Sequence, residues 1–198
     1  FYEGKGHDSM YVTVNGSQCS GAQYFNEPCV SVTICTPGDA TKCQTIDNLL
    51  LDTGSYGLRI FSSVISVPLQ QVKLCAGGAN LNQACSVNAD CPGSVCTKEI
   101  ADCAKFGDGS SDWGPVQYAD VQFGGEPVIS SLPIHVMNSN YATVPGACGV
   151  PDIGPCDAYF NGILGVGLDA VDKTSAYYSC VGTTCSSIAM GAFSDSVK

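Results

Sequence analysis

The chain has 198 residues, which is long enough for one large domain or two small ones with a sizeable core. A net charge of −10, with only 8 lysines and arginines, argues against nucleic acid or an anionic membrane as a partner. Glycine is abundant (23 residues), charged residues are sparse (13%), and valine, isoleucine, threonine and tyrosine are frequent, which together favour an all-β domain with many turns.

Thirteen cysteines predict disulfides formed in an oxidising compartment. A zinc site is a poor explanation, because no Cys-x-x-Cys pair occurs and the two histidines, His7 and His135, are far apart; no metal or other cofactor is expected. Because thirteen is odd, one thiol is free or pairs with a segment or chain not present here. No signal peptide or transmembrane run is visible, and the start at Phe1 fits a processed or trimmed protein that is secreted, periplasmic or on the cell surface.

The first predicted elements are strands. Met10 to Val14 predicts a strand that ends at an Asn15-Gly16 turn. Val30 to Cys35 alternates apolar and polar residues, and after a turn loop a second strand runs from Cys43 to Asp52. We expect a Cys35–Cys43 disulfide to close this hairpin and fix its register, with two free cysteines as the alternative.

The stretch Asn48-Leu-Leu-Leu-Asp52-Thr-Gly-Ser55 joins an apolar run to an acid. Burying a carboxylate costs several kcal/mol or forces its protonation, so an acid at the end of a buried strand needs a purpose. Gly54 lets backbone amides approach Asp52 closely, and Thr53 and Ser55 carry hydroxyl donors. Asp52 is therefore a candidate acid/base group, and an ordinary Asp-Gly turn is the alternative.

The residue composition changes after the acid loop. Ser62 to Leu69 predicts a short helix or turn cut off by Pro68. Residues 75–103 hold five cysteines among glycine, asparagine, alanine and aspartate, which predicts a disulfide-stapled surface insertion. Short bridges are expected among three of these cysteines, Cys85, Cys91 and Cys96.

Phe106-Gly-Asp-Gly-Ser110 predicts a hairpin tip, because its glycines can adopt positive φ. Trp113 to Phe123 alternates as a strand and is followed by a Gly124-Gly125 turn. Val128 to Met137 predicts a further strand, in which Pro133 marks an edge or a bulge.

The last third of the chain is less regular. Residues 138–158 predict a loop region closed by a Cys148–Cys156 bridge. The apolar pair Ile163-Leu164 follows, with a glycine on each side. Leu168 to Tyr178 predicts a helix. Cys180 and Cys185 enclose a small loop that a disulfide would close.

Three features occur in order: Asp52-Thr-Gly-Ser55, the tip Phe106-Gly-Asp-Gly-Ser110 with the Asp120–Gly125 strand end behind it, and Asn161-Gly-Ile-Leu-Gly165. Over about residues 10–168 this order resembles one lobe of a pepsin-like aspartic peptidase. In that family a hairpin flap covers the Asp-Thr-Gly-Ser acid loop, and a later Gly-Ile-Leu-Gly segment packs against the loop. The chain is most similar to a bacterial family of pepsin-like proteins of unassigned function.

The resemblance implies an all-β, pepsin-like lobe of antiparallel sheets with a flap hairpin. Residues 1–198 would form one N-terminal-type lobe that carries the Cys-rich insertion at about 75–103. A second lobe is then absent from this chain.

The resemblance also implies hydrolysis of peptide bonds by a water activated between two Asp carboxylates, one of them Asp52. Thr53 would hold the loop against its partner, and Ser55 would donate a hydrogen bond to the carboxylate. The implied supporting residues are Thr53, Gly54 and Ser55 in the acid loop, Phe106, Gly107, Asp108, Gly109, Ser110 and Arg59 at the flap and substrate, and Ile163, Leu164 and Gly165 packed on the loop.

The chain departs from the pepsin pattern in four respects. It contains only one Asp-Thr-Gly or Asp-Ser-Gly string, and its Cys-rich insertion is foreign to pepsins. Phe106 replaces the flap tyrosine, and Arg59 replaces the tryptophan that partners that tyrosine. The two replacements are linked, and a basic Arg59 would lower the carboxylate pKa or bind an acidic substrate group.

Three explanations account for the lack of a second Asp-Thr-Gly or Asp-Ser-Gly carboxylate in this sequence. It lies in the other half of a longer bilobal protein, it comes from a homodimer mate, or the lobe is a non-catalytic binding or structural relative that holds a peptide without cleaving it. We expect a peptide or protein substrate and favour the bilobal explanation. An unrelated disulfide-rich β domain, such as an adhesin or a carbohydrate binder, is the remaining alternative.

Overall fold

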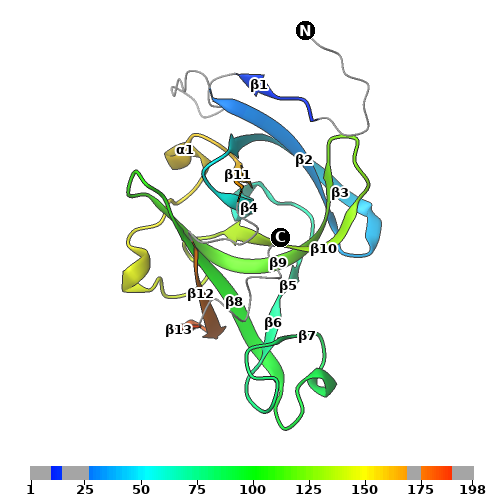
Figure 1. Ribbon diagram of the computed structural model, residues 1–198, viewed down its shortest axis with the longest axis vertical. Coiled ribbons are helices and arrows are strands. Elements are labelled where there is room, and N and C mark those ends of the chain that lie inside the picture. The colour runs from blue at the N-terminus through cyan, green and yellow to red at the C-terminus, as the bar shows by residue number, and fades with distance from the viewer. Residues whose placement is uncertain (1–9, 15–26, 169–174, 189–198) are drawn as a thin grey trace.

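The computed structural model describes residues 10–14, 27–168 and 175–188. The described part is built mostly from strands, which confirms the predicted all-β class (Figure 1). The predicted Asn15-Gly16 turn lies outside it. The strands are β1 (Thr13–Val14), β2 (Pro28–Thr36), β3 (Asp39–Asp52), β4 (Tyr56–Phe61), β5 (Gln70–Gln71), β6 (Lys73–Cys75), β7 (Ala84–Cys85), β8 (Cys96–Lys105), β9 (Ser111–Phe123), β10 (Ile129–Met137), β11 (Gly162–Val166), β12 (Ser175–Val181) and β13 (Thr184–Ser187). The helical turns are η1 (Ser62–Val64), η2 (Asn88–Asp90), η3 (Gly146–Cys148) and α1 (Pro155–Ala158).

Six strands pair into a closed ring in the order β2, β3, β11, β4, β10, β9 and back to β2. The main core cluster takes apolar side chains from all six of these strands, which is why their sequences alternate. Its buried members are Val30, Val32, Ile34, Ile46, Leu49, Leu58, Ile60, Ala119, Val121, Ile134, Val136 and Leu164. Removing their surface from water is the main force that closes the ring.

The sheet is mixed, which corrects the expectation of antiparallel sheets. Strand β11 runs parallel to β3 and antiparallel to β4, and β10 runs parallel to β4. The reason is topological. The short turn between β3 and β4 makes these two strands run in opposite directions, so a strand inserted between them must be parallel to one of them.

The β8–β9 hairpin extends from the ring and carries further strands on its outer edge. Strand β12 pairs with β8, and β13 pairs with β12. From Ser175 onwards this corrects the helix predicted over Leu168 to Tyr178; residues 169–174 lie outside the described part. Tyr177 and Tyr178 are both buried but belong to different core clusters, an arrangement that a strand with alternating side chains provides.

The described residues contain five disulfides: Cys35–Cys43, Cys75–Cys91, Cys85–Cys96, Cys103–Cys148 and Cys180–Cys185. The predicted Cys35–Cys43 and Cys180–Cys185 bonds are present, and each joins directly paired residues of a hairpin. Five disulfides fit an oxidising compartment. No helix in the described ranges has the length and apolarity needed to cross a membrane.

The predicted Cys148–Cys156 bridge is wrong. Cys148 bonds to Cys103 of β8, 45 positions away in sequence. Burial explains the choice, because Cys103 and Cys148 are each 1% exposed and share a core cluster, whereas Cys156 is exposed on α1. The bond fastens the loop after β10 to the β8–β9 hairpin.

The stapled insertion is shorter than residues 75–103. Two disulfides, Cys75–Cys91 and Cys85–Cys96, hold the segment around β7 at one end of the molecule (Figure 1). From Cys96 the chain belongs to β8, where Ile100 and Ala101 are fully buried.

Candidate functional site

The acid loop, residues 53–55, joins β3 to β4. Asp52 is half-buried at the end of β3, and its Oδ1 accepts a hydrogen bond of 2.8 Å from the backbone N–H of Gly54. Thr53 is exposed, while Ser55 is only 2% exposed. The predicted hydrogen bond from Ser55 to Asp52 is absent. The Ser55 Oγ is buried and has no hydrogen-bond partner among the described residues.

Strand β11 fits between the two strands that flank this loop. Gly165 is the register partner of both Asp52 in β3 and Gly57 in β4. The residue before it, Leu164, pairs with Leu51 in β3 and Leu58 in β4. The backbone N–H of Gly167 donates to the carbonyl of Ser55 at 2.9 Å. Ile163, Leu164 and Gly165 therefore pair with the strands on both sides of the acid loop, and Gly167 makes the hydrogen bond to the loop itself.

The tip of the β8–β9 hairpin is a compact turn. The Phe106 N–H donates to the Ser110 carbonyl at 3.0 Å. Asp108 Oδ1 accepts hydrogen bonds from the N–H and hydroxyl of Ser110, and Gly109 has φ +94°. Gly107 completes the turn, which is therefore held by its own side chains.

Asp52 and this hairpin tip line the same cleft, of about 290 Å³. Leu50, Asp52 and Ile163 come from the ring. Phe106, Asp108 and Ser110 come from the tip, and the remaining lining residues are Asp152, Asp157, Ala158, Tyr159 and Phe160. The cleft thus brings Asp52 and the tip of the β8–β9 hairpin into one lining.

The cleft is acidic. Among the described residues its lining includes the four aspartates Asp52, Asp108, Asp152 and Asp157 and no lysine, arginine or histidine. Hydrogen bonds from Ser110 lower the pKa of Asp108, whereas burial, reinforced by Asp157 and Asp108, raises the pKa of Asp152. The negative charge favours a cationic group in the cleft.

Arg59 lies outside the cleft lining and is 1% exposed, so a substrate group has no surface of it to reach. Its Nη1 donates to the Tyr56 carbonyl, and its Nη2 lies 3.9 Å from Asp102 Oδ2. The same carboxylate oxygen is 3.3 Å from His135 Nδ1, and His135 is the register partner of Arg59. Burial, reinforced by Arg59, lowers the pKa of His135 well below its ordinary value, so this imidazole is neutral.

Asp112, at the start of β9, is a second buried acid near Arg59. It is 1% exposed, and neither of its carboxylate oxygens has a hydrogen-bond partner among the described residues. Burial raises the pKa of Asp112 to about 7; Asp152 adds to the rise and Arg59 opposes it. A neutral carboxyl is therefore buried next to the hairpin tip in acid solution.

The sequence matches a family model described as "Protein of unknown function (DUF3443)" over residues 4–197. The chain belongs to the DUF3443 family. No curated protein matches it. The match includes the acid loop, the hairpin tip and β11, so all three belong to one family unit.

The cysteines of this DUF3443 chain do not form a metal centre in the described part. The sulfurs of Cys75, Cys85 and Cys91 lie within 4.8 Å of one another, but all three are in disulfides and are not thiolate ligands. Burial, together with Glu27, raises the pKa of the Cys29 thiol to about 11, which makes this group a poor nucleophile.

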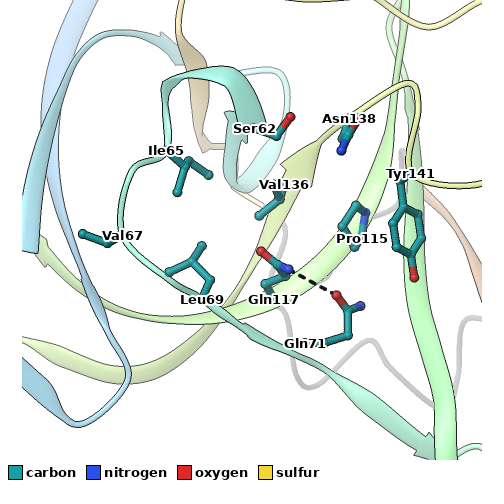
Figure 2. Close-up of a pocket in the computed structure, with 10 residues that line it drawn as sticks. All are labelled: Ser62, Ile65, Val67, Leu69, Gln71, Pro115, Gln117, Val136, Asn138 and Tyr141. Atoms are coloured by element: carbon teal, nitrogen blue, oxygen red, sulfur yellow. Dashed lines mark hydrogen bonds between the residues drawn. The ribbon is translucent and has the colours of Figure 1, made fainter. Parts of the chain in front are cut away.

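A second pocket of the DUF3443 chain, of about 230 Å³, has a different character (Figure 2). Ile65, Val67 and Leu69 form an apolar side, and the Gln117 side-chain amide donates to Gln71 Oε1 at 3.3 Å. The lining residues in the described part of the chain include no carboxylate, histidine or cysteine. This pocket offers shape and neutral hydrogen bonds but no acid/base group.

Sequence reasoning missed four acids of this DUF3443 site. Asp152 and Asp157 come from the segment predicted as a loop, and the sequence holds no signal that places them in the same cleft as Asp52. Asp102 and Asp112 did carry a signal. Apolar or small residues flank each of them on both sides, as expected of strands buried on both faces.

Proposed function

We propose that this DUF3443 protein is an aspartic endopeptidase, or one lobe of such an enzyme, and that Asp52 is one of its two catalytic carboxyls. The observation that carries the proposal is the position of Asp52. One of its oxygens is held by the Gly54 N–H, and the residue lines a cleft whose other wall is the tip 106–110. A cleft between a fixed acid and a projecting hairpin suits an extended peptide.

In the proposed reaction, two neighbouring carboxyls share one proton, because their like charges disfavour double ionisation. The ionised carboxylate takes a proton from water, and the protonated carboxyl donates to the scissile carbonyl oxygen. Water adds to the carbonyl carbon, and the C–N bond then breaks as the leaving nitrogen gains a proton. The Gly54 N–H orients Asp52, and the hairpin tip limits access of bulk water.

The second carboxyl comes from outside the 198 residues, because they contain a single Asp-Thr-Gly string. Two of the other acids of the cleft, Asp108 and Asp157, are less suited to the role. Asp108 is engaged by Ser110, and Asp157 accepts a hydrogen bond of 3.1 Å from the Ile153 N–H, so each stabilises its own loop. We propose a second lobe of a longer polypeptide as the source, with a second copy of this chain as the alternative.

A non-catalytic peptide-binding protein on the same scaffold is the second candidate. It is favoured by the lack of a hydrogen bond between Ser55 and Asp52 and by Phe106, which has no hydroxyl to offer a substrate. Such a protein would bind peptides in the cleft without cleaving them.

The deciding experiment digests an unfolded protein with the polypeptide that contains these residues, between about pH 3 and pH 7, and sequences the fragments. Fragments with new termini support the peptidase. Saturable peptide binding without new termini supports the binding protein and rejects the peptidase.

Mixing distinguishes the two sources of the second acid. Wild-type and Asp52→Asn polypeptides are unfolded together, refolded and assayed at several ratios. If two copies each supply Asp52, activity falls as the square of the wild-type fraction. If the second acid lies in the same polypeptide, activity falls in direct proportion to it.

A further inference from the structure

The buried polar cluster of Arg59, Asp102 and His135 takes no part in the proposed chemistry. Each residue is 3% exposed or less, and each comes from a different strand: β4, β8 and β10. Buried ion pairs commonly add little net stability compared with apolar residues of the same volume. Stability alone is therefore a poor account of this cluster.

The first connection runs from Arg59 to the acid loop. Its Nη1 donates to the carbonyl of Tyr56, the residue that follows Ser55. Tyr56 is also the register partner of Val166 in β11, and the backbone of Gly165 approaches it so closely that an added Cβ atom would lie 2.4 Å from its nitrogen. The guanidinium thus fixes the end of the loop that carries Gly54, the donor to Asp52.

The second connection runs from Arg59 to the hairpin. Arg59 Nη2 lies 3.9 Å from Asp102 Oδ2, and Asp102 is on β8, the strand that leads into the tip 106–110. His135 Nδ1 lies 3.3 Å from the same oxygen on the ring side, although neither ring nitrogen makes a hydrogen bond among the described residues. A guanidinium can contact two acceptors at once because its donors form a rigid planar fork, which a lysine lacks.

We infer that Arg59 is a positioning residue. Through the Tyr56 carbonyl and the Asp102 carboxylate it holds the acid loop and the hairpin in a fixed relation, so that Asp52 faces the tip. The effect on catalysis rests on the proposed function, but the connection itself does not. A merely structural ion pair would stabilise the fold without ordering the loop.

The test compares Arg59→Met/Asp102→Leu with wild type. Replacing both charges by apolar side chains avoids an unpaired buried charge, so the denaturation midpoint is expected to stay near that of wild type. Hydrogen exchange of the Gly54 amide, followed by NMR, is expected to become at least about tenfold faster, because the loop has lost its anchor. Exchange of the core amide of Ile34, remote from the loop, should be unchanged.

Two further variants complete the test. Arg59→Lys keeps the charge but not the fork, and is expected to give intermediate exchange at Gly54. Lys42→Met, which breaks the exposed pair of Lys42 and Asp39 (2.8 Å), is the control and should leave Gly54 unaffected.

Unchanged exchange at Gly54 in folded Arg59→Met/Asp102→Leu would overturn the inference. If that variant does not fold, Asp102→Asn serves in its place, and the same acceleration is expected because the link to β8 is weakened. Where the protein cleaves peptides, kcat should fall more than tenfold with little change in KM. If exchange of the Gly54 amide becomes faster in a protein that cleaves no peptide, the positioning role of Arg59 is supported and the peptidase proposal is rejected.

Discussion

Gly165 is the register partner of Asp52 in the parallel pair of β11 and β3, and a Cβ atom on Gly165 would lie 2.4 Å from the Tyr56 nitrogen. No side chain fits at that distance without moving the backbone. The acid loop is therefore shaped by a glycine far away in sequence, and this relationship leads to the first prediction.

Gly165→Ala should destabilise the protein by about 1–3 kcal/mol and displace residues 55–56, because the added methyl group meets backbone and not a flexible side chain. Urea denaturation measures the loss. Gly146→Ala is the matched control, since a Cβ atom there has no neighbour within 4 Å. Equal stability of the two variants would contradict the packing described.

The acid Asp112 predicts a pH dependence of stability with a definite sign. Its folded-state pKa is raised from 3.8 to about 7. Between about pH 4 and pH 7 the unfolded chain loses this proton while the folded chain keeps it, so stability falls as pH rises and levels off above about pH 7. The contribution lost is on the order of 4 kcal/mol at most, at about 1.4 kcal/mol for each unit of pKa.

Asp112→Asn removes the titrating group and should flatten this part of the stability curve, as measured by denaturation at a series of pH values. Asp108→Asn is the control with the opposite sign. The folded-state pKa of Asp108 is lowered, so its small contribution is present above the unfolded pKa and lost as pH falls. A wild-type curve that rises from pH 4 to pH 7, with no change in Asp112→Asn, would refute the assignment.

The position of the acid loop was predictable because its signals are local. An apolar run into Asp52 and the glycine-rich tip at 106–110 each predict a turn, and the structure places both on one cleft. The partner of Cys148 was not predictable from spacing, because Cys103 is distant in sequence and only the packing of β8 against η3 brings the two together.

Other features depend on contacts that no local pattern encodes. Asp120 was interpreted as a strand-end residue, yet its carboxylate accepts hydrogen bonds from the Gly38 and Ser131 N–H groups, at 2.8 and 2.7 Å. The resemblance implies a place near the flap and substrate for Arg59, because Arg59 replaces the tryptophan that partners the flap tyrosine in pepsins. In the structure its side chain points to buried partners, a direction set by the pairing of β4 with β10 and β11.

The Cys103–Cys148 disulfide should stabilise the fold more than Cys180–Cys185. It closes a loop of 45 residues compared with 5, which corresponds to about 4 and about 2 kcal/mol in the chain-entropy treatment. Replacing each pair by alanine and measuring guanidinium denaturation gives the two losses. A larger loss for the short loop would show that native packing, and not loop length, sets the order.

The acidic cleft predicts a preference for basic peptides. Asp52→Asn should bind a peptide with lysine at its centre several-fold more tightly than the same peptide with glutamate, and salt should weaken the preference. Fluorescence anisotropy measures both affinities. Adding Asp152→Asn and Asp157→Asn should reduce the preference, whereas adding Asp39→Asn, at the start of β3 and outside the cleft lining, should not. An equal affinity for both peptides would refute the role of the cleft charge.

The most direct test of the central claim is the ratio of kcat/KM between wild type and Asp52→Asn in acid solution, with Asp157→Asn as the matched control from the same cleft. We predict a loss of about 10²- to 10⁴-fold for Asp52→Asn, because a group that transfers protons in the transition state is removed, and a much smaller change for Asp157→Asn. An Asp52→Asn protein that folds normally and cleaves at the wild-type rate would contradict the claim.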